Sequence, residues 1–456
     1  MAQDLFMKIQ YVSISPTTTA NNEGCYALTP ELLAATGARY SRNNEGLDAI
    51  VSKIDFSNTD KSVDGIFKMV DYGHASIADM APIALFIDDI TLYAAYFLWT
   101  LSPTAGGQEC STRYIKMDSS NVASVDDLGI NDQYEHQYDL YVAKSFNYYD
   151  KALKLWTKIG EIYPELTKIP SSLLNSESEK DKKQVARMMR NFAFDRARVY
   201  LPVSTLTGVM MVQSARAWAN LSSHLQSHSL KEFNLIGKQI EEKLNIGAPR
   251  LVRHCKSTDA IKAYYKREFE LWNSDYDLFQ GTNLYAPPMT VNKSDLDFRT
   301  NRYSPFSSNL SRIPVKVSWS DMSFGEIRDL NRHRTGNKYC PFIPKGFYGA
   351  LDQIPDNDLD ICNNLKNLHK GFESTTWYAQ NLMKSTSDYV YFTSLGHQYL
   401  FEHTTTADKF LYEMELRTGV GSHYKYAEHC HDALKLWYQK YPQTKGIVFE
   451  GSAEPE

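Results

Sequence analysis

Three consecutive residues, Arg332, His333 and Arg334, could bind an anionic group. Gly336 follows shortly after them, and a glycine there predicts that a helix ends and that its last turn presents the cations. Residues two apart point to different sides of a helix, so both arginines can face one ligand only if the turn unwinds. A solvated helix C-terminus is the alternative interpretation of this tripeptide.

A second polar group occupies residues 108–114, with the sequence QECSTRY, directly after Gly106 and Gly107. This segment combines hydroxyl groups, a carboxylate and one guanidinium group. It suits a phosphomonoester, because hydroxyl and backbone N–H groups can bond the oxygens while Arg113 makes a bidentate charge-assisted pair. A capping and turn sequence with a surface arginine is the alternative.

In the first half, a strand and a helix should precede this polar segment. The apolar residues 83–87 predict a strand, and Asp88, Asp89 and Thr91 could cap a helix over residues 93–98. This stretch is the most apolar of the chain. Two carboxylates near its middle would be costly in hydrocarbon, so we expect a buried strand passing into a helix and no membrane span.

The second half repeats this order of elements. Alternation over residues 313–317 predicts a strand, and Ser320 with Asp321 should open the helix that follows. Each half also contains a long amphipathic helix, over residues 136–156 in the first half and 365–383 in the second. Two copies of one architecture are therefore predicted.

The composition is that of an ordinary globular protein. The chain has 456 residues, of which 43% are hydrophobic and 23% charged, and its formal net charge is −5. We therefore expect no general attraction to nucleic acid or to an anionic membrane, and an anionic ligand must meet a local cluster of cations. The six cysteines lack C-x-x-C spacing, which favours reduced thiols in a cytoplasm over a disulfide framework or a zinc site. The start lacks a secretory signal, so a cytoplasmic location is expected.

Five short motifs of the first half resemble, in order and spacing, the pattern of the flavin-dependent thymidylate synthase family. They are Ala38-Arg39-Tyr40-Ser41, Gly73-His74-Ala75-Ser76, Gln108-Glu109-x-Ser111-x-Arg113-Tyr114, Ala197-Arg198-x-x-Leu201-Pro202 and Ala215-Arg216. The family's usual forms are A-R-x-S, G-H-x-[ST], R-H-R followed by N-E-x-S-x-R-Y, then A-R-x-x-L-P and N-A-R. The resemblance covers nearly all of residues 1–245 and, more faintly, residues 301–440.

The two halves depart from the family pattern in complementary ways. The first half has an apolar stretch around Trp99 where R-H-R is expected, whereas the second half has R-H-R but lacks the S-x-R-Y loop. Residues 404–408 and Arg417 look like the family's N-A-R to L-R stretch, with the first arginine replaced and the last retained. The first half keeps Arg216 and lacks the later arginine. Each copy thus lacks what the other keeps.

Family members form homotetramers whose active sites are assembled from several subunits, so the resemblance implies that two fused copies share the residues of one site. The implied FAD-binding residues are Ser41, Ser76, Asp79 and Arg216 of the first copy, with Arg332, His333 and Arg334 of the second. The implied nucleotide-binding residues are Glu109, Ser111, Thr112, Arg113, Arg198 and Arg417, and the three arginines are the expected catalytic residues. No metal is implied.

The resemblance implies an α+β fold of two fused domains, residues 1–245 and 301–456, joined by a connector at 246–300. Each domain should hold a mainly antiparallel sheet with long helices, and a homodimer would recreate the family's tetramer. The implied reaction methylates dUMP to dTMP with methylenetetrahydrofolate, FAD and NADPH. Fixed cations such as Arg198 and Arg417 would polarise the pyrimidine carbonyls.

Two other activities fit the same residues. One is the transfer of a hydroxymethyl or other one-carbon group to a pyrimidine nucleotide, and the other is nucleotide or flavin binding without catalysis. Cys340 lacks the P-C-H order of the unrelated classical thymidylate synthase, so we interpret it as a loop thiol. The run from Glu428 to His431 fans around a helix instead of converging on a metal. His423 is a further candidate for a flavin or folate contact.

Overall fold

The computed structural model describes residues 7–12, 28–41, 46–71, 76–273, 280–356, 360–419 and 422–451. These residues form two compact units. Unit 1 comprises the described residues of 1–110, 121–133 and 204–271, and unit 2 comprises those of 111–120, 134–203 and 272–456. Unit 2 therefore takes two segments from the first half of the sequence.

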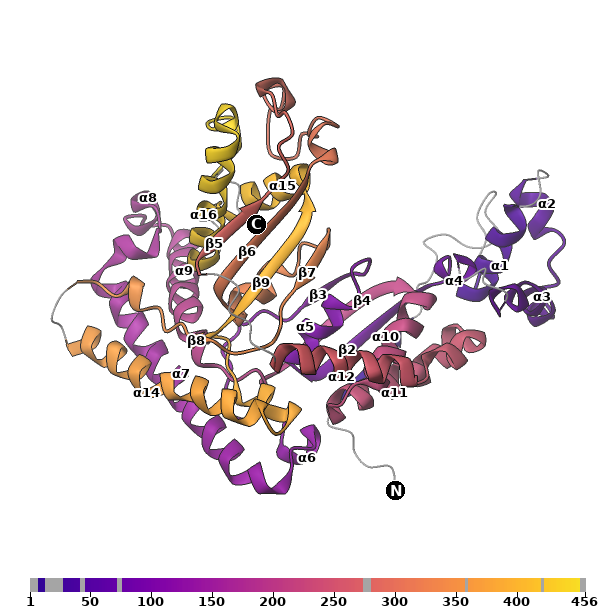
Figure 1. Cartoon of the computed structure of the whole chain (residues 1–456), viewed down its shortest axis with the longest axis horizontal. Coiled ribbons are helices and arrows are strands. Elements are labelled where there is room, and N and C mark those ends of the chain that lie inside the picture. Colours follow the sequence, from indigo (N-terminus) through magenta and orange to yellow (C-terminus); the bar gives the residue numbers. More distant parts are fainter. Residues whose placement is uncertain are drawn as a thin grey trace. The chain divides into compact units, whose positions relative to one another are not determined.

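Unit 1 is built on a four-stranded sheet with the order β1-β2-β4-β3, and all its neighbouring strands are antiparallel (Figure 1). The strands are β1 (Lys8–Val12), β2 (Pro82–Thr91), β3 (Gly106–Glu109) and β4 (Leu206–Ser214). The helices are α1 (Pro30–Tyr40), α2 (Leu47–Val51), α3 (Thr59–Asp71), α4 (Ser76–Asp79), α5 (Leu92–Thr100), α6 (Val125–Leu128), α10 (Ala215–Ser227), α11 (Lys231–Gly247) and α12 (Asp259–Asn273). Side chains of β4 alternate between buried and half-buried, as a strand covered on one face requires.

The apolar stretch of unit 1 is a buried strand that passes into a helix, as predicted. Of the three predicted capping residues, Thr91 is confirmed, whereas Asp88 and Asp89 belong to β2. A bulge between Ile87 and Ile90 absorbs them, and Asp89 adopts a φ of 59°. Thr91 caps α5, accepting a hydrogen bond from the N–H of Ala94.

Unit 2 is built on a second antiparallel sheet, with the order β5-β6-β9-β7 and with β8 paired to β9. Its strands are β5 (Thr282–Tyr285), β6 (Pro314–Ser323), β7 (Asn337–Tyr339), β8 (Gly346–Phe347) and β9 (His397–Thr406). Its helices are α7 (Glu135–Ile162), α8 (Ser171–Leu174), α9 (Glu179–Ala197), α13 (Phe324–Leu330), α14 (Asp360–Met383), α15 (Ala407–Arg417) and α16 (Tyr424–Lys440). The strand β5 lies in the segment predicted as a connector and forms an edge of this sheet.

Short 3₁₀ helices complete the described chain. They span Asp132–Tyr134, Pro164–Thr167, Arg198–Tyr200, Pro249–Cys255, Lys293–Asp295, Leu310–Arg312, Leu351–Gln353, Ser387–Phe392 and Pro442–Thr444. In the described part of the chain, none of the helices is long and apolar enough to cross a membrane.

The helix after β6 begins later than predicted. Ser320 and Asp321 remain in the strand, where a bulge between Trp319 and Met322 shifts the register. Ser323 is the residue that caps α13, through a reciprocal capping box with Glu326. The bulge moves the strand end forward, just as the bulge in β2 does.

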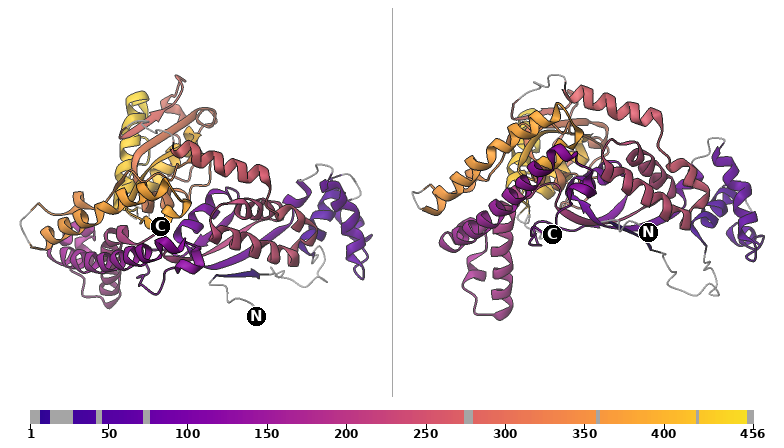
Figure 2. Two further views of the ribbon diagram at one scale, coloured as in Figure 1. Left: turned by 60° about the horizontal axis from the view of Figure 1, so that its bottom comes forward. Right: turned by 90° about the horizontal axis from the view of Figure 1, so that it is seen from below.

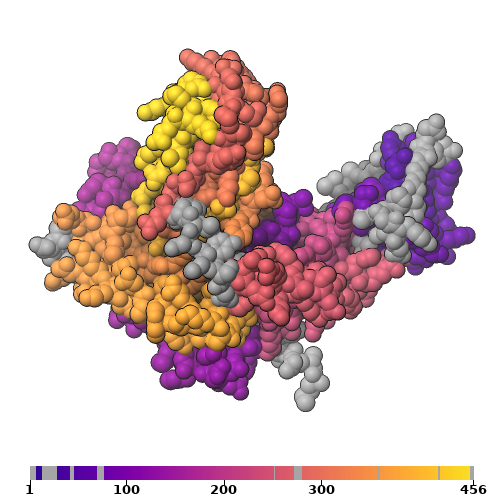
Figure 3. Space-filling view, in the orientation of Figure 1, coloured from indigo at the N-terminus to yellow at the C-terminus, as the bar shows by residue number. Residues whose placement is uncertain are grey.

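The predicted long helices are confirmed as α7 and α14, which pack against each other in unit 2 (Figure 2). α7 also packs along α9 and buries Tyr149, Trp156 and Ile159. One side of α16 buries Tyr426 and Trp437, while its other side is open to solvent (Figure 3). These helices contribute buried apolar side chains to the core of unit 2.

Candidate active site

Unit 2 brings together three of the predicted catalytic residues. Arg113 lies in the loop 111–120, Arg198 begins a 3₁₀ helix directly after α9, and Arg417 is the last residue of α15. All three side chains are largely buried. Because buried guanidinium groups need counter-charges, their partners define the site.

Arg113 makes a bidentate ion pair with Asp195. Its Nε and Nη2 donate to the two carboxylate oxygens at 2.9 and 3.0 Å. Burial opposes the charge of Arg113, but the carboxylate outweighs it, so the pKa of Arg113 is raised. The hydroxyl of Ser111 accepts from the N–H of Arg113 at 3.2 Å and so shapes the loop that presents this side chain.

The side chain of Arg198 is held by α13 and by the loop 111–120. Its Nη2 donates to Asp329 of α13 at 2.8 Å, and its Nη1 donates to the hydroxyl of Thr112 at 3.3 Å. The backbone after Arg198 pairs with the residues before β9, since the N–H of Gly396 bonds the carbonyl of Val199 at 2.7 Å. Arg198 is therefore fixed by residues from both halves of the sequence.

Asp329 lies within the field of several cations. Burial would raise the pKa of Asp329, but the guanidinium groups of Arg198, Arg113 and Arg332 outweigh it and hold that pKa well below its usual range. The first arginine of R-H-R therefore lies near enough to act on the same carboxylate as Arg113 and Arg198. The predicted nucleotide-binding and cofactor-binding arginines of unit 2 thus form one charged cluster.

The R-H-R tripeptide follows α13 as an unwound turn, and Arg332 is exposed. Arg417 reaches this turn, because its Nε donates to Nε2 of His333 at 2.6 Å. His333 must accept this bond, which requires a neutral ring, and burial lowers the pKa of His333 to about 3. Gly336 has a φ of 70°, and a Cβ there would lie 2.1 Å from the carbonyl oxygen of Thr404. The glycine therefore allows the turn to pack directly on β9.

His423 lies beside the cluster as the N-cap of α16. Its Nδ1 accepts from the N–H of Lys425 at 3.3 Å, and its Nε2 faces the carbonyl oxygen of Asp195 at the same distance. A carbonyl only accepts, so Nε2 carries the proton. Burial lowers the pKa of His423 to about 4, and the ring is neutral at pH 7.

The cluster has a net charge that suits a phosphomonoester. Arg113, Arg198, Arg332 and Arg417 supply four positive charges, and Asp195 with Asp329 supplies two negative charges, which leaves a net charge of +2. Phosphomonoesters carry about −1.5 to −2 at pH 7. The rings of His333 and His423 are neutral and do not change this count.

The other predicted residues lie in unit 1. Asp79 accepts from Nη1 of Arg216 at 2.9 Å and from the hydroxyl of Ser214 at 3.2 Å, so two predicted FAD-binding residues form a half-exposed ion pair. Ser41 donates to the carbonyl of Ala38. Ser76 begins α4, while Gly73, His74 and Ala75 of the same motif lie outside the described residues.

Glu109 also belongs to unit 1, although Ser111, Thr112 and Arg113 belong to unit 2. Its carboxylate accepts a hydrogen bond from the indole N–H of Trp99 at 3.1 Å. Trp99 occupies the place where the family pattern has R-H-R. The first copy thus has a neutral donor where a cation was expected.

Cys340 and the run from Glu428 to His431, which we did not interpret as functional from the sequence, have the surroundings of ordinary structural residues. Cys340 is in no disulfide and has intermediate exposure. In the run from Glu428 to His431, His429 is buried against Glu326 at 2.7 Å, whereas His431 faces Glu450 at 2.6 Å. Among the described residues, no three metal-binding side chains converge.

Four residues around the arginines were not predicted from the sequence, namely Asp195, Asp329, His403 and Glu413. Asp195 and Asp329 each lie three residues before an arginine, but they bond Arg113 and Arg198, which are distant from them in the sequence, so that spacing did not indicate the ion pairs. His403 contacts Thr335 of the turn from a strand, Glu413 contacts His403 from a helix, and no local pattern relates them.

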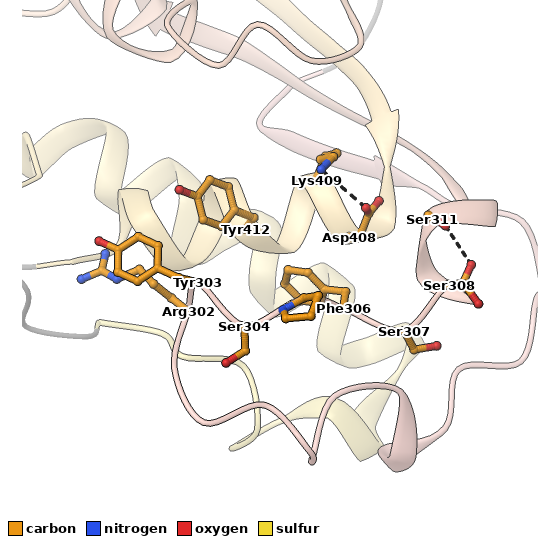
Figure 4. A pocket seen from close by; sticks show the side chains of 11 residues that line it. Arg302, Tyr303, Ser304, Phe306, Ser307, Ser308, Ser311, Asp408, Lys409 and Tyr412 are labelled. Carbon is orange, nitrogen blue, oxygen red and sulfur yellow. Dashed lines mark hydrogen bonds and ion pairs between the residues drawn. The ribbon is translucent and has the colours of Figure 1, made fainter.

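A cavity of about 450 Å³ opens in unit 2 at the start of α15, apart from the predicted residues (Figure 4). Tyr303 and Tyr412 line one end, and Lys409 and Asp408 lie farther along it, with their charged atoms 3.9 Å apart. In the sequence pattern, Asp408 takes the place of the motif arginine, which the first half has as Arg216.

Comparison with known proteins gives a family for the first half. Residues 26–250 match the family described as thymidylate synthase complementing protein. The resemblance that we inferred from the motifs is confirmed over these residues, which are about half of the chain. The match ends before the second sheet begins.

Two curated relatives and two crystal structures are similar to parts of the chain. The relatives are UPF0159 proteins from Chlamydia muridarum, 24% identical over 51% of this chain, and from Chlamydia pneumoniae, 23% identical over 46%. These matches cover 47% and 42% of the relatives, so the chain matches less than half their length. The structures are of a UMP/dUMP methylase, PolB, from Streptomyces cacaoi, bound with 5-Br dUMP or 5-Br UMP. They are 16% and 14% identical, cover 54% of this chain and 93% of the other, and have TM-scores of 0.33 and 0.32.

Proposed function

We propose that the chain methylates dUMP to dTMP, because residues 26–250 match the family described as thymidylate synthase complementing protein. Methylenetetrahydrofolate would give the methylene group, and NADPH would reduce the flavin. FAD, when bound and reduced, would supply the hydride. The observation that carries the proposal is the cluster of Arg113, Arg198 and Arg417 in unit 2, at positions that match the family's motifs.

Arg113 and Arg198 are the proposed phosphate ligands. A bound phosphate would compete with Asp195 and Asp329 for their guanidinium N–H groups, which are already oriented by bidentate and buried contacts. Ser111 and Thr112 would add hydroxyl groups to the same ligand, and Glu109 stays a predicted nucleotide residue. Because the carboxylates hold the arginines in place, little side-chain entropy would be lost on binding.

The R-H-R turn has the donors that a flavin cofactor requires. Arg332 is exposed and Arg334 is half-buried, so two guanidinium groups can reach a pyrophosphate or a flavin carbonyl. His333 is neutral and bonded to Arg417, which places this predicted cofactor residue next to a predicted nucleotide residue. Ser41, Ser76, Asp79 and Arg216 are the cofactor residues proposed for the first copy.

We also propose that the chain is a tandem duplication with copies near residues 1–245 and 301–456. The strand order of the second sheet repeats that of the first, with β5, β6, β7 and β9 in place of β1, β2, β3 and β4. Both β2 and β6 carry a bulge near the end and continue directly into a helix. A homodimer in the cytoplasm, forming a pseudo-tetramer, is the proposed assembly.

The test is the mass of the product. The purified full-length chain is incubated with dUMP, methylenetetrahydrofolate, FAD and NADPH, and the nucleotide is analysed by mass spectrometry. A gain of one methyl group at the pyrimidine supports the proposal. A different one-carbon gain would reject it in favour of a hydroxymethyl or related transfer. Binding of FAD and dUMP without any product would indicate a non-catalytic homologue.

A further inference from the structure

A buried acid–imidazole pair lies under the R-H-R turn. His403 is on β9 and Glu413 is on α15, and their side chains are at most 2% exposed. Nδ1 of His403 lies 2.8 Å from a carboxylate oxygen of Glu413. Neither residue belongs to the motifs that relate this chain to its family.

The contacts of His403 hold its ring between the turn and Glu413. Its Nε2 lies 2.7 Å from the carbonyl oxygen of Thr335, which can only accept, so Nε2 donates this bond. Its Nδ1 lies on the other side of the ring, 2.8 Å from Glu413. Burial would raise the pKa of Glu413, but His403, His333 and Lys338 outweigh it and lower that pKa to about 2, so the carboxylate is ionised. The carboxylate therefore faces Nδ1 and holds the ring in the orientation in which Nε2 meets Thr335.

His403 is one of several residues whose contacts fix the turn. Lys338 donates from its ammonium group to the carbonyl of His333, and Gly336 packs against the backbone of Thr404. Nε of Arg417 donates to the ring of His333 at 2.6 Å. The bond from His403 to Thr335 fixes the residue directly after the tripeptide. The position of the His333 ring therefore depends on backbone that His403 holds.

We propose that Glu413 and His403 are positioning residues, whose contact holds the turn so that His333 can accept the hydrogen bond of Arg417. The proposal rests on the proposed function in so far as the turn meets FAD and Arg417 meets the nucleotide. Glu413 stands four residues before Arg417 on the same helix, so the helix couples the two sites mechanically. Loss of the pair should weaken the binding of both ligands.

The matched variants are Glu413→Gln and Glu415→Gln. Both remove a buried carboxylate of α15, but Glu415 is bonded to Arg299 at 2.7 and 2.8 Å and to the N–H of Phe449, away from the turn. Amide hydrogen exchange over residues 331–339 reports the turn directly. Titrations of the full-length protein with FAD and with dUMP report the two sites.

In Glu413→Gln we expect exchange over 331–339 to be roughly 10-fold faster or more, and both affinities to fall roughly 10- to 100-fold, because the carboxylate beside Nδ1 of His403 is lost. Glu415→Gln should leave both readouts near those of the wild type. Unchanged exchange in Glu413→Gln, or equal effects in the two variants, would overturn the proposal.

A double variant covers the case in which one partner without the other prevents folding. E413Q/H403Q removes both partners together and keeps amide groups in their place, and it should again speed exchange over 331–339. Unchanged exchange in this variant would also overturn the positioning role. A wild-type protein that binds neither FAD nor dUMP would refute the proposed function, while the exchange data would still decide the role of Glu413 and His403.

Discussion

Replacement of Asp195 by Asn tests whether the buried carboxylates hold the arginines that we propose to bind phosphate. Asp195 is about 90% buried and makes a bidentate pair with Arg113 at 2.9 and 3.0 Å. Two charges about 4 Å apart attract by about 4 kcal/mol at an effective dielectric constant of 20. Asn keeps an acceptor oxygen, so we expect the free energy of unfolding to fall by about 3 kcal/mol, as when one partner of a buried pair is removed.

Bound dUMP should recover much of this loss. A dianionic phosphate near Arg113 would replace the missing negative charge, so dUMP should raise the unfolding free energy of Asp195→Asn more than that of the wild type. The assay is chemical denaturation with and without dUMP. The control is Asp432→Asn, which neutralises a carboxylate at 2.8 Å from Lys435 on the exposed side of α16 and should cost less than about 1 kcal/mol. Equal costs for the two variants, or no differential rescue by dUMP, would refute the reasoning.

Three further predictions concern the same unit. In steady-state assays, Arg417→Ala should lower kcat/KM by at least about 100-fold, because it removes a charge-assisted contact. The control Arg187→Ala, on the exposed surface of α9, should leave kcat/KM unchanged. Gly336→Ala should lower the free energy of unfolding more than Gly446→Ala does. Both glycines have a positive φ, but only a Cβ at position 336 would lie 2.1 Å from a carbonyl oxygen. Equal losses in the two variants would contradict this. Burial would lower the pKa of His429, but two carboxylates raise it from 6.5 to about 10. The contribution of His429 to the free energy of unfolding is therefore fully present below pH 6.5 and is lost as the pH rises through 10. A His429→Gln variant should lack this alkaline loss in unfolding free energies measured between pH 6 and 10.

The sequence predicted the elements of the fold better than their ends. Periodicity located the strands at 83–87 and 313–317 and both long helices, because these segments are long and bury one side. It located the start of α5 through Thr91 but missed the start of α13, since a bulge moves the end of β6 forward by a few residues. A bulge depends on the neighbouring strand and has no local sequence signal.

The sequence predicted the arginines of the cluster but not its carboxylates. Arg113, Arg198 and Arg417 were named because they match family motifs, and their role in ligand binding stays a prediction. Asp195 and Asp329 were not found, because a carboxylate on a helix is usually a solvated surface residue and only the fold brings it to an arginine. The same holds for His403 and Glu413, whose relation exists only across β9 and α15.

In unit 1, Trp99 stands where the family pattern has R-H-R, and its indole N–H bonds the partly buried carboxylate of Glu109 at 3.1 Å. A neutral donor with a large apolar ring satisfies this carboxylate at a buried position, which a guanidinium group does less well. The R-H-R turn of unit 2, by contrast, has cations near Asp329 and Glu413. Trp99→Arg should therefore destabilise the chain and add no flavin binding, whereas a gain in FAD bound per chain would contradict this reasoning.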